Sequence, residues 1–173
     1  MTGTATARPV PVTGDSFRDA LARHAAGVVV VTARPARDEP AGLTATSFTS
    51  VSLDPPLVSF YVAASSSTFP RLRAAATFAV NVLGHDQAEL AARFASRDVD
   101  RFAAPTRWRP GPGGEPLLEG AAVRLRCDWH SLREIGDHLL VVGRVIGVEV
   151  GATETPLLYH HGRFGHFTAH RPH

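Results

Sequence analysis

The stretch Gly42–Pro56, GLTATSFTSVSLDPP, decides how this chain folds and what its surface offers. Small hydroxyl side chains crowd it before it alternates into Val51 and Leu53 and stops at an Asp-Pro-Pro break. A strand needs bulky side chains on its buried face, yet Gly42 and Ala45 leave backbone open among these hydroxyls. Such a surface can direct N–H and O–H donors at a ligand's phosphate or ring edge. On composition alone, a solvated edge strand rich in Ser and Thr is the alternative.

Length and composition indicate one globular domain. The chain has 173 residues, of which 44% are hydrophobic and 20% charged, values typical of a domain with a sizeable core. All 18 basic residues are arginine, the formal net charge is +2, and no run of arginines forms a stripe. A nucleic-acid partner is therefore disfavoured. The single cysteine, Cys127, excludes an intramolecular disulfide and a cysteine-based metal cluster, and its alternating surroundings predict a small buried side chain.

The chain divides into a flexible leader (1–14), one domain (15–168) and a short tail (169–173). No apolar stretch approaches the roughly 20 residues that span a bilayer, and the N-terminus has no apolar core of a secretory signal. We therefore expect a cytoplasmic protein without a membrane partner.

The pattern of elements predicts many strands with a few short helices. Asp15 or Ser16 can cap a first helix over Phe17–His24. Asp98–Glu119 is rich in Pro and Gly and has little periodicity, so it is interpreted as a long excursion. The remaining predicted elements are strands at 28–33, 43–53, 57–63, 78–83, 123–130, 139–150 and within 157–167, and helices at 68–75 and 87–95. Without regular strand–helix alternation or a GxGxxG motif, a Rossmann domain is disfavoured.

The order of several sequence blocks identifies a family. The run that continues from Gly42 to Val62, GLTATSFTSVSLDPPLVSFYV, resembles the signature strand and turn of the flavin reductase-like domain family. Further blocks follow in the family's order: FAVNVL (78–83), Gln87 with LAARFAS (90–96), PLLEGA (116–121), GDH (136–138) and PLLYHHGRFG (156–165). The resemblance extends from about Phe17 to Phe167, nearly the whole chain.

This resemblance implies a fold and an activity. The fold is mainly β, a flavin-binding split barrel with a six-stranded Greek-key arrangement and a few peripheral helices. The protein would be a homodimer with flavin in a groove near the subunit interface. It would reduce flavin, FMN or FAD, by hydride transfer from NAD(P)H and supply reduced flavin to a separate monooxygenase. NADH is expected rather than NADPH, because no compact basic pair is present to hold a 2′-phosphate.

The resemblance also implies the flavin contacts. These residues are Thr44, Ala45, Thr46, Ser47, Phe48, Ser50, Val51, Ser65, Ser66, Ser67, Arg71, Leu72, Phe94 and Ala95. Backbone amides of the first group would face the flavin, and the serine loop with Arg71 would hold its phosphate. Taken without the family, the serine loop is a plain helix-capping loop and Phe94 is a core residue. The family commonly has a lysine in this loop, and this chain has none.

The nicotinamide would lie against His138, in the turn Gly136-Asp137-His138, where Asp137 can set its tautomer. The further nicotinamide contacts that the resemblance implies are Tyr159, His161, Gly162, Arg163 and Phe164. Adjacent His160 and His161 point to opposite faces of a strand, so a metal site is not expected there. No catalytic acid, base or nucleophile is predicted, since hydride transfer between two cofactors requires none.

Two other functions remain open from the sequence. The same barrel can serve as a non-catalytic flavin or haem carrier or sensor, because fold does not fix function. It can also serve as a reductase with another bound cofactor, such as a deazaflavin.

Overall fold

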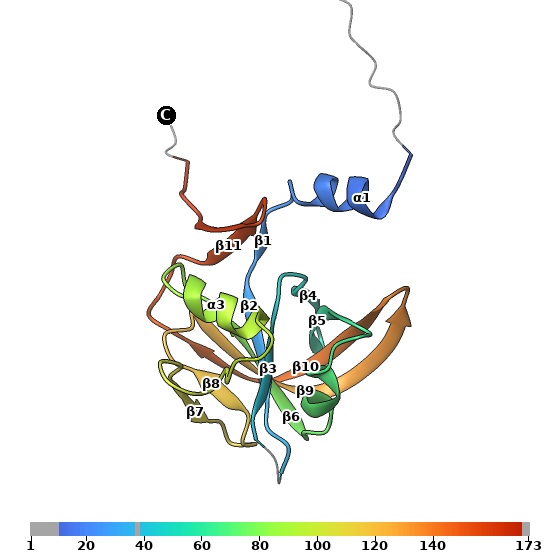
Figure 1. Ribbon diagram of the computed structural model, residues 1–173. Coiled ribbons are helices and arrows are strands. Elements are labelled where there is room, and N and C mark those ends of the chain that lie inside the picture. Colours follow the sequence, from blue (N-terminus) through green and yellow to red (C-terminus); the bar gives the residue numbers. More distant parts are fainter. Residues whose placement is uncertain (1–10, 37–38, 171–173) are drawn as a thin grey trace, which may run out of the picture.

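The structure, a computed structural model, describes residues 11–36 and 39–170 and is mainly β (Figure 1). Its helices are α1 (Gly14–Leu21), α2 (Phe69–Arg73) and α3 (Ala88–Ala95). Its strands are β1 (Ala26–Gly27), β2 (Val29–Ala33), β3 (Ala41–Ala45), β4 (Thr49–Leu53), β5 (Pro56–Ala63), β6 (Thr77–Val82), β7 (Trp108–Pro110), β8 (Pro116–Leu118), β9 (Val123–Ile135), β10 (His138–Val150), β11 (Leu157–His160) and β12 (Arg163–His166). Residues 1–10 of the predicted leader and 171–173 of the predicted tail lie outside the described residues, so the division into leader, domain and tail stays a prediction.

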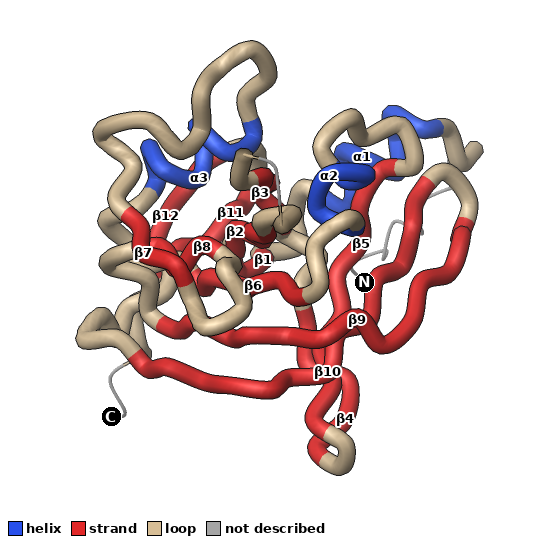
Figure 2. Tube along the Cα trace, turned by 90° about the horizontal axis from the view of Figure 1, so that it is seen from below, coloured by secondary structure: helices blue, strands red, loops and turns tan. Residues whose placement is uncertain are grey.

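A seven-stranded antiparallel sheet organises the fold, in the order β3-β2-β6-β9-β10-β5-β4. Figure 2 shows β9 and β10 side by side, with the helices toward the opposite side of the view. The sheet curls until β3 and β5 approach each other at a seam. There the hydroxyl of Ser47 accepts a hydrogen bond from the amide of Tyr61 (2.9 Å) and donates to its carbonyl (3.3 Å). No ladder joins β3 to β5 in the described part of the chain, so the sheet is not closed into a barrel.

The mainly β prediction is confirmed. Six strands, namely β2, β3, β5, β6, β9 and β10, follow one another around the sheet as the split barrel requires, and β4 extends the edge beyond β5. The family fold therefore fits, with its seam left open.

Strand β2 separates two hydrophobic clusters. Successive side chains of a strand point to opposite faces, so Val29 and Val31 pack inside the sheet, while Val28 and Val30 face the cluster that contains Phe94 of α3. All five residues of β2 are buried. The predicted buried strand is confirmed, and this double burial explains its unbroken apolar sequence.

The predicted single strand at 43–53 is wrong, because the chain bends at Thr46–Phe48. β3 pairs with β2, whereas β4 pairs with β5. The Ser47 bonds to Tyr61 lie at the bend, where the chain leaves one partner strand for another. The alternation of side chains along the sequence continues through the bend, so it does not reveal that the chain changes its partner strand there.

Helix α1 begins earlier than predicted. Its N-cap is Thr13, whose hydroxyl accepts from the amide of Ser16 (3.1 Å) in a reciprocal capping box. None of its side chains is buried, and Figure 1 shows it standing away from the sheet. Phe17 and Leu21, 58% and 54% exposed, form an apolar stripe on it.

The predicted long excursion contains an ordered hairpin, β7–β8. Its anchor is Glu115, a fully buried carboxylate that accepts hydrogen bonds from the guanidinium of Arg126 on β9 and the hydroxyl of Thr77 on β6 (3.0 Å for the latter). The hairpin is thereby fixed to the outer face of the sheet.

The C-terminal segment holds two strands where one was predicted. β11 and β12 form a hairpin that pairs with β1 in a separate three-stranded sheet. The turn passes through His161 (φ 49°) and Gly162 (φ 74°), both left-handed. The amide of His161 donates to the carbonyl of Ala22 (2.9 Å), which ties the hairpin to the end of α1.

Candidate functional site

A groove of about 590 Å³ opens where β3 and β5 end, beside the loop that precedes α2 and the last turn of α3. This volume is within the range of small-molecule and cofactor sites. Its lining residues are Leu43, Thr44, Ala45, Thr46, Ser47, Tyr61, Val62, Ala63, Ser65, Ser66, Ser67, Thr68, Phe94, Ala95, Arg97, Arg101 and His138. The groove therefore gathers residues from both sides of the seam.

The pairing register of β10 with β5 places His138 in the groove. It lies opposite Ala63 in the ladder between β10 and β5, next to the serine loop. The amide of Ala64 donates to the carbonyl of Asp137 (2.9 Å), which holds the loop against the turn. The Nδ1 atom of His138 is 2.7 Å from a carboxylate oxygen of Asp137. The hydrogen bond from His138, helped by its charge, lowers the pKa of Asp137 below its ordinary value, and it leaves Nε2 of the imidazole for a ligand.

The hydroxyls of the signature strand divide into engaged and free groups. Thr44 donates to the carbonyl of Ala91 in α3 (2.7 Å), and Ser47 is engaged with β5. Thr46 is exposed, and its hydroxyl has no hydrogen-bond partner among residues 11–36 and 39–170. A ligand in the groove can thus bond to the Thr46 hydroxyl without breaking a protein contact.

The serine loop shows the same division. The hydroxyl of Ser66 accepts from the amide of Phe69 (3.3 Å) at the start of α2. Within the described residues the hydroxyls of Ser65 and Ser67 have no partner, and both residues are exposed. The capping role predicted as an alternative applies to Ser66, and the two flanking serines face the groove.

Close packing of α3 on β3 forms one wall. A Cβ atom added to Gly42 would lie 2.6 Å from the ring of Phe94, so this wall depends on glycine. Phe94 is buried, as its alternative core role predicted, and it also lines the groove. Ala45 is buried as well, which leaves no room there for a larger side chain.

Several residues predicted to contact flavin lie outside this groove. Phe48 packs on the core inside the sheet, and Leu72 is fully buried in it. The guanidinium of Arg71 donates to the carbonyl of Glu39 (3.0 Å) and borders a neighbouring cavity. Ser50 and Val51 are exposed on β4. In a single chain, the structure brings these five residues into no common site with Thr46 and His138, and their roles stay predictions.

The predicted nicotinamide residues on the β11–β12 hairpin also lie apart from His138. His161, Arg163 and Phe164 border a hollow of their own, and the ring of Tyr159 packs against that of Phe164 with centroids 5.2 Å apart. Gly162 forms the turn. Their role as nicotinamide contacts stays a prediction.

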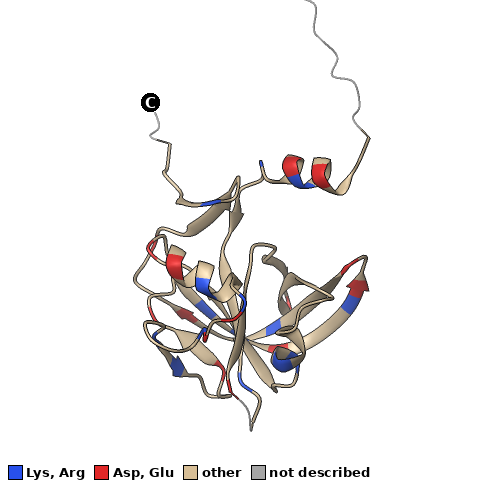
Figure 3. Ribbon diagram, viewed as in Figure 1, with Lys and Arg blue, Asp and Glu red and all other residues tan. Residues whose placement is uncertain are grey.

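Sequence reasoning did not identify Tyr61, Arg97 and Arg101, which line the groove. The signal available was the spacing of Arg97 and Arg101 directly after the α3 block. Arg101 lies in the segment from Asp98 that was interpreted as a separate excursion, and Arg97 lies just outside the LAARFAS block, which ends at Ser96. Charges are otherwise scattered over the fold (Figure 3).

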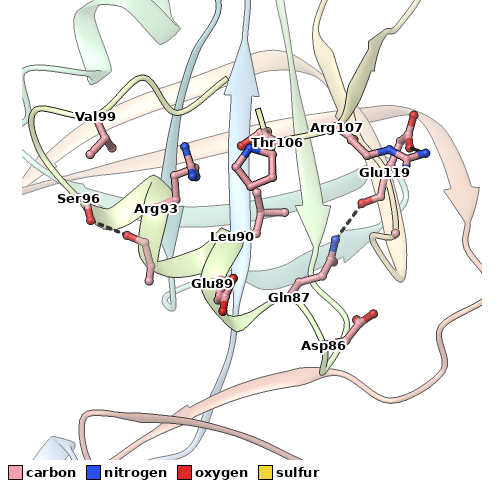
Figure 4. Close-up of a pocket in the computed structure, with 13 residues that line it drawn as sticks. Asp86, Gln87, Glu89, Leu90, Arg93, Ser96, Val99, Thr106, Arg107 and Glu119 are labelled. Carbon is pink, nitrogen blue, oxygen red and sulfur yellow. Dashed lines mark hydrogen bonds and ion pairs between the residues drawn. The ribbon is translucent and has the colours of Figure 1, made fainter. Parts of the chain in front are cut away.

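A larger cavity of about 790 Å³ lies on the outer side of α3 (Figure 4). Its polar groups bond largely to the protein itself: Gln87 donates to the carbonyl of Glu119 (2.8 Å), Arg107 pairs with the Glu119 carboxylate (2.7 Å), and Arg93 donates to the carbonyl of Asp100 (3.3 Å). It contains none of the predicted site residues, so the groove at the seam is the stronger candidate.

The described residues offer neither a metal site nor a membrane-spanning helix. Among them, no three His, Cys, Asp or Glu side chains are grouped so as to hold a metal ion. None of their helices is long and apolar enough to cross a membrane.

Comparisons with known proteins agree with this fold. Residues 21–168 match the flavin reductase like domain. The chain is 44% identical over 152 residues to the NADH:FMN oxidoreductase of Rhodococcus qingshengii, covering 86% of this chain and 79% of that protein. It superimposes on the NADH:FAD oxidoreductase SgcE6 of Streptomyces globisporus C-1027 with a TM-score of 0.85 and 38% identity, covering 96% and 100% of the two chains. It also superimposes on nitrilotriacetate monooxygenase component B of Mycobacterium thermoresistibile with a TM-score of 0.86 and 32% identity, covering 92% and 90%. Since sequence and fold agree over most of its length, the chain belongs to the flavin reductase-like domain family.

Proposed function

We propose that this protein is an NAD(P)H-dependent flavin reductase that passes reduced flavin to a separate monooxygenase in the cytoplasm. The observation that carries the proposal is the groove at the seam, where Thr46, the serine loop and His138 meet in a chain of this family. Relatives are named for reduction of FMN or FAD by NADH, and one is a monooxygenase component.

The residues of the groove fit a flavin. Small side chains at Ala45, Ala63 and Ala95 leave room for a flat ring, and the free hydroxyls of Thr46, Ser65 and Ser67 suit a polar chain and a phosphate. Bound flavin would supply the redox chemistry, accepting a hydride at N5 from NADH, which leaves as NAD⁺. The protein's task is to hold the two rings in contact and to exclude water from between them.

His138 is the residue proposed to hold the nicotinamide. Its Nδ1 atom is committed to Asp137, so Nε2 is the ring nitrogen that remains to form a hydrogen bond with the carboxamide of NADH. We propose NADH as the preferred donor.

We further propose a homodimer. The apolar stripe of Phe17 and Leu21 on α1 is uncovered in the single chain, and the β11–β12 hairpin is tied to the end of that helix. For Tyr159 to contact the nicotinamide as predicted, this hairpin of a second copy must face the groove. We expect an interface above about 2,000 Å² in total, typical of obligate dimers. A monomer in sedimentation at micromolar concentration would contradict this.

The test of function is a visible spectrum of the purified protein followed by NADH oxidation with added FMN and FAD. Rapid oxidation that depends on added or bound flavin supports the proposal. A flavin or haem spectrum without NADH oxidation would instead identify a carrier or sensor, and activity that requires a deazaflavin would identify the other reductase.

A further inference from the structure

The groove adjoins an open face of the β9–β10 hairpin. In the ladder of that hairpin, His138 lies opposite Ile135 of β9. Two residues further along β10, Leu140 lies between Tyr61 of β5 and Arg133 of β9. Residues opposite each other in a ladder, and residues two apart along one strand, share a face of the sheet. Arg133 is therefore on the face that carries His138.

This face is open to solvent in the single chain. Tyr61 and Ile135 are 41% and 49% exposed, and Arg133 is exposed as well. Tyr61 and His138 also line the groove at the seam, so the hairpin face begins where the groove ends. Diagonal neighbours in a ladder lie about 7–8 Å apart, and His138 and Arg133 are such neighbours. A molecule held at His138 can therefore extend along the hairpin to Arg133.

Arg133 carries a positive charge that the fold itself does not use. Among residues 11–36 and 39–170, its guanidinium makes no hydrogen bond and no ion pair. The other arginines of β9 and β10 each pair with a carboxylate: Arg124 with Glu149, Arg126 with Glu115, and Arg144 with Asp128. Arg133 thus differs from every other arginine of the hairpin, since its charge is left for a molecule from solution.

The carboxylates nearest to Arg133 in the sequence do not take this charge. Glu134 is the next residue of β9, so its side chain points to the opposite face of the sheet. Asp137 lies in the turn, and its carboxylate is engaged with Nδ1 of His138 (2.7 Å). The row from Tyr61 to Arg133 contains no acid. An anion that approaches along this row therefore meets a guanidinium and no competing carboxylate from the row itself.

We infer that Arg133 binds the diphosphate of the hydride donor whose nicotinamide is held at His138. The inference rests on the proposed function, since it takes NADH to be the donor and the groove to be where its ring meets the flavin. In NADH one ribose separates the nicotinamide from the diphosphate, so a donor held at His138 directs its diphosphate over Leu140 towards Arg133. A guanidinium binds phosphate oxygens through parallel N–H bonds. Arg133 thus strengthens donor binding without touching the atoms that exchange the hydride.

The test compares two hydride donors in steady-state kinetics of the full-length wild-type protein and of Arg133→Gln. One donor is NADH, and the other is N-benzyl-dihydronicotinamide, which has the ring but no phosphate. In the variant the KM for NADH should rise about three- to tenfold at unchanged kcat, and the increase should shrink as salt is added. The KM for the donor without phosphate should stay at the wild-type value. An equal increase for both donors, or a wild-type KM for NADH, would overturn the inference.

Arg144→Gln is the matched control, because it removes the same charge from the same hairpin at a residue that does not line the groove. It should leave the KM for NADH unchanged, and an increase as large as that in Arg133→Gln would overturn the inference. Arg133→Lys keeps the charge and should retain most of the affinity for NADH. NADPH has the same diphosphate, so its KM should rise by the same factor in Arg133→Gln; an increase confined to NADPH would overturn the assignment to the diphosphate. If the wild-type protein oxidises neither donor with any flavin, the proposed function fails instead.

Discussion

Replacement of His138 by alanine is the most direct test of how the groove receives NADH. The imidazole lies opposite Ala63 and beside the serine loop, with its side chain 45% exposed and Nδ1 committed to Asp137. Only Nε2 then remains for NADH, so the substitution would remove the one hydrogen bond that we propose between His138 and the nicotinamide. Such a bond contributes about 0.5–1.5 kcal/mol when neutral and up to about 3 kcal/mol when charged. The KM for NADH should therefore rise about threefold to a hundredfold.

The assay is steady-state oxidation of NADH at saturating flavin, combined with a flavin titration of each variant. Flavin affinity should stay near the wild-type value, because His138 is assigned to the nicotinamide alone. If the imidazole also aligns the two rings, kcat should fall as well. His130→Ala, another exposed histidine on the sheet but outside the groove, is the control and should leave both constants unchanged. Wild-type KM and kcat in the His138 variant would refute the assignment.

Three further predictions concern stability, reactivity and binding. Burial raises the pKa of Glu115, but the hydrogen bonds led by that from Arg126 outweigh it and lower the pKa. The stabilisation from the ionised Glu115 is therefore fully present at pH values above the ordinary pKa of a glutamate, and it is lost as pH falls through the lowered pKa of the folded protein. Glu115→Gln should reduce the free energy of unfolding by about 2–4 kcal/mol at neutral pH, or roughly 5–15 °C in Tm. It should also flatten the acid limb of a plot of Tm against pH. Burial, with neighbouring carboxylates, raises the pKa of Cys127 to about 12, so iodoacetamide at pH 8 should modify it only in denaturant, and rapid labelling of the native protein in a mass spectrum would contradict this. Ala45→Leu should weaken flavin binding far more than Thr46→Ser in a titration, since the first fills a buried position and the second keeps the hydroxyl; equal affinities would argue against this placement of the flavin.

The sequence was most informative where one pattern had one physical cause. The apolar run at 28–33 predicted a strand buried on both faces, and β2 is such a strand. The block order predicted the family and its mainly β fold. The sequence predicted His138 in the turn directly before the strand at 139–150; the structure includes it in β10, and the ladder with β5 places it in the groove. The buried strand and the turn before β10 depend on neighbouring residues in the sequence, and the position of His138 depends on the register between β10 and β5.

Other features depend on tertiary contacts that leave no local pattern. The bend between β3 and β4 lies where Ser47 bonds to a strand that follows later in the chain. The hairpin β7–β8 depends on Glu115 reaching Arg126 across the sheet, and a proline-rich segment gives no periodic sign of that ion pair. The separation of the β11–β12 residues from His138 likewise follows from pairing with β1, which the family blocks do not encode.

The open seam has a consequence for the response of the protein to its ligand. In the described residues, β3 and β5 are joined at that point by a hydroxyl rather than by a ladder, and the groove lies across the same two strands. A molecule bound in the groove would contact both β3 and β5 and would therefore hold these two parts of the sheet together. Local opening should accordingly be easiest along this line in the empty protein, and amide hydrogen exchange in β3 and at the end of β5 should slow when flavin is added. Cofactor loading would then regulate the lifetime of the folded chain as well as its chemistry.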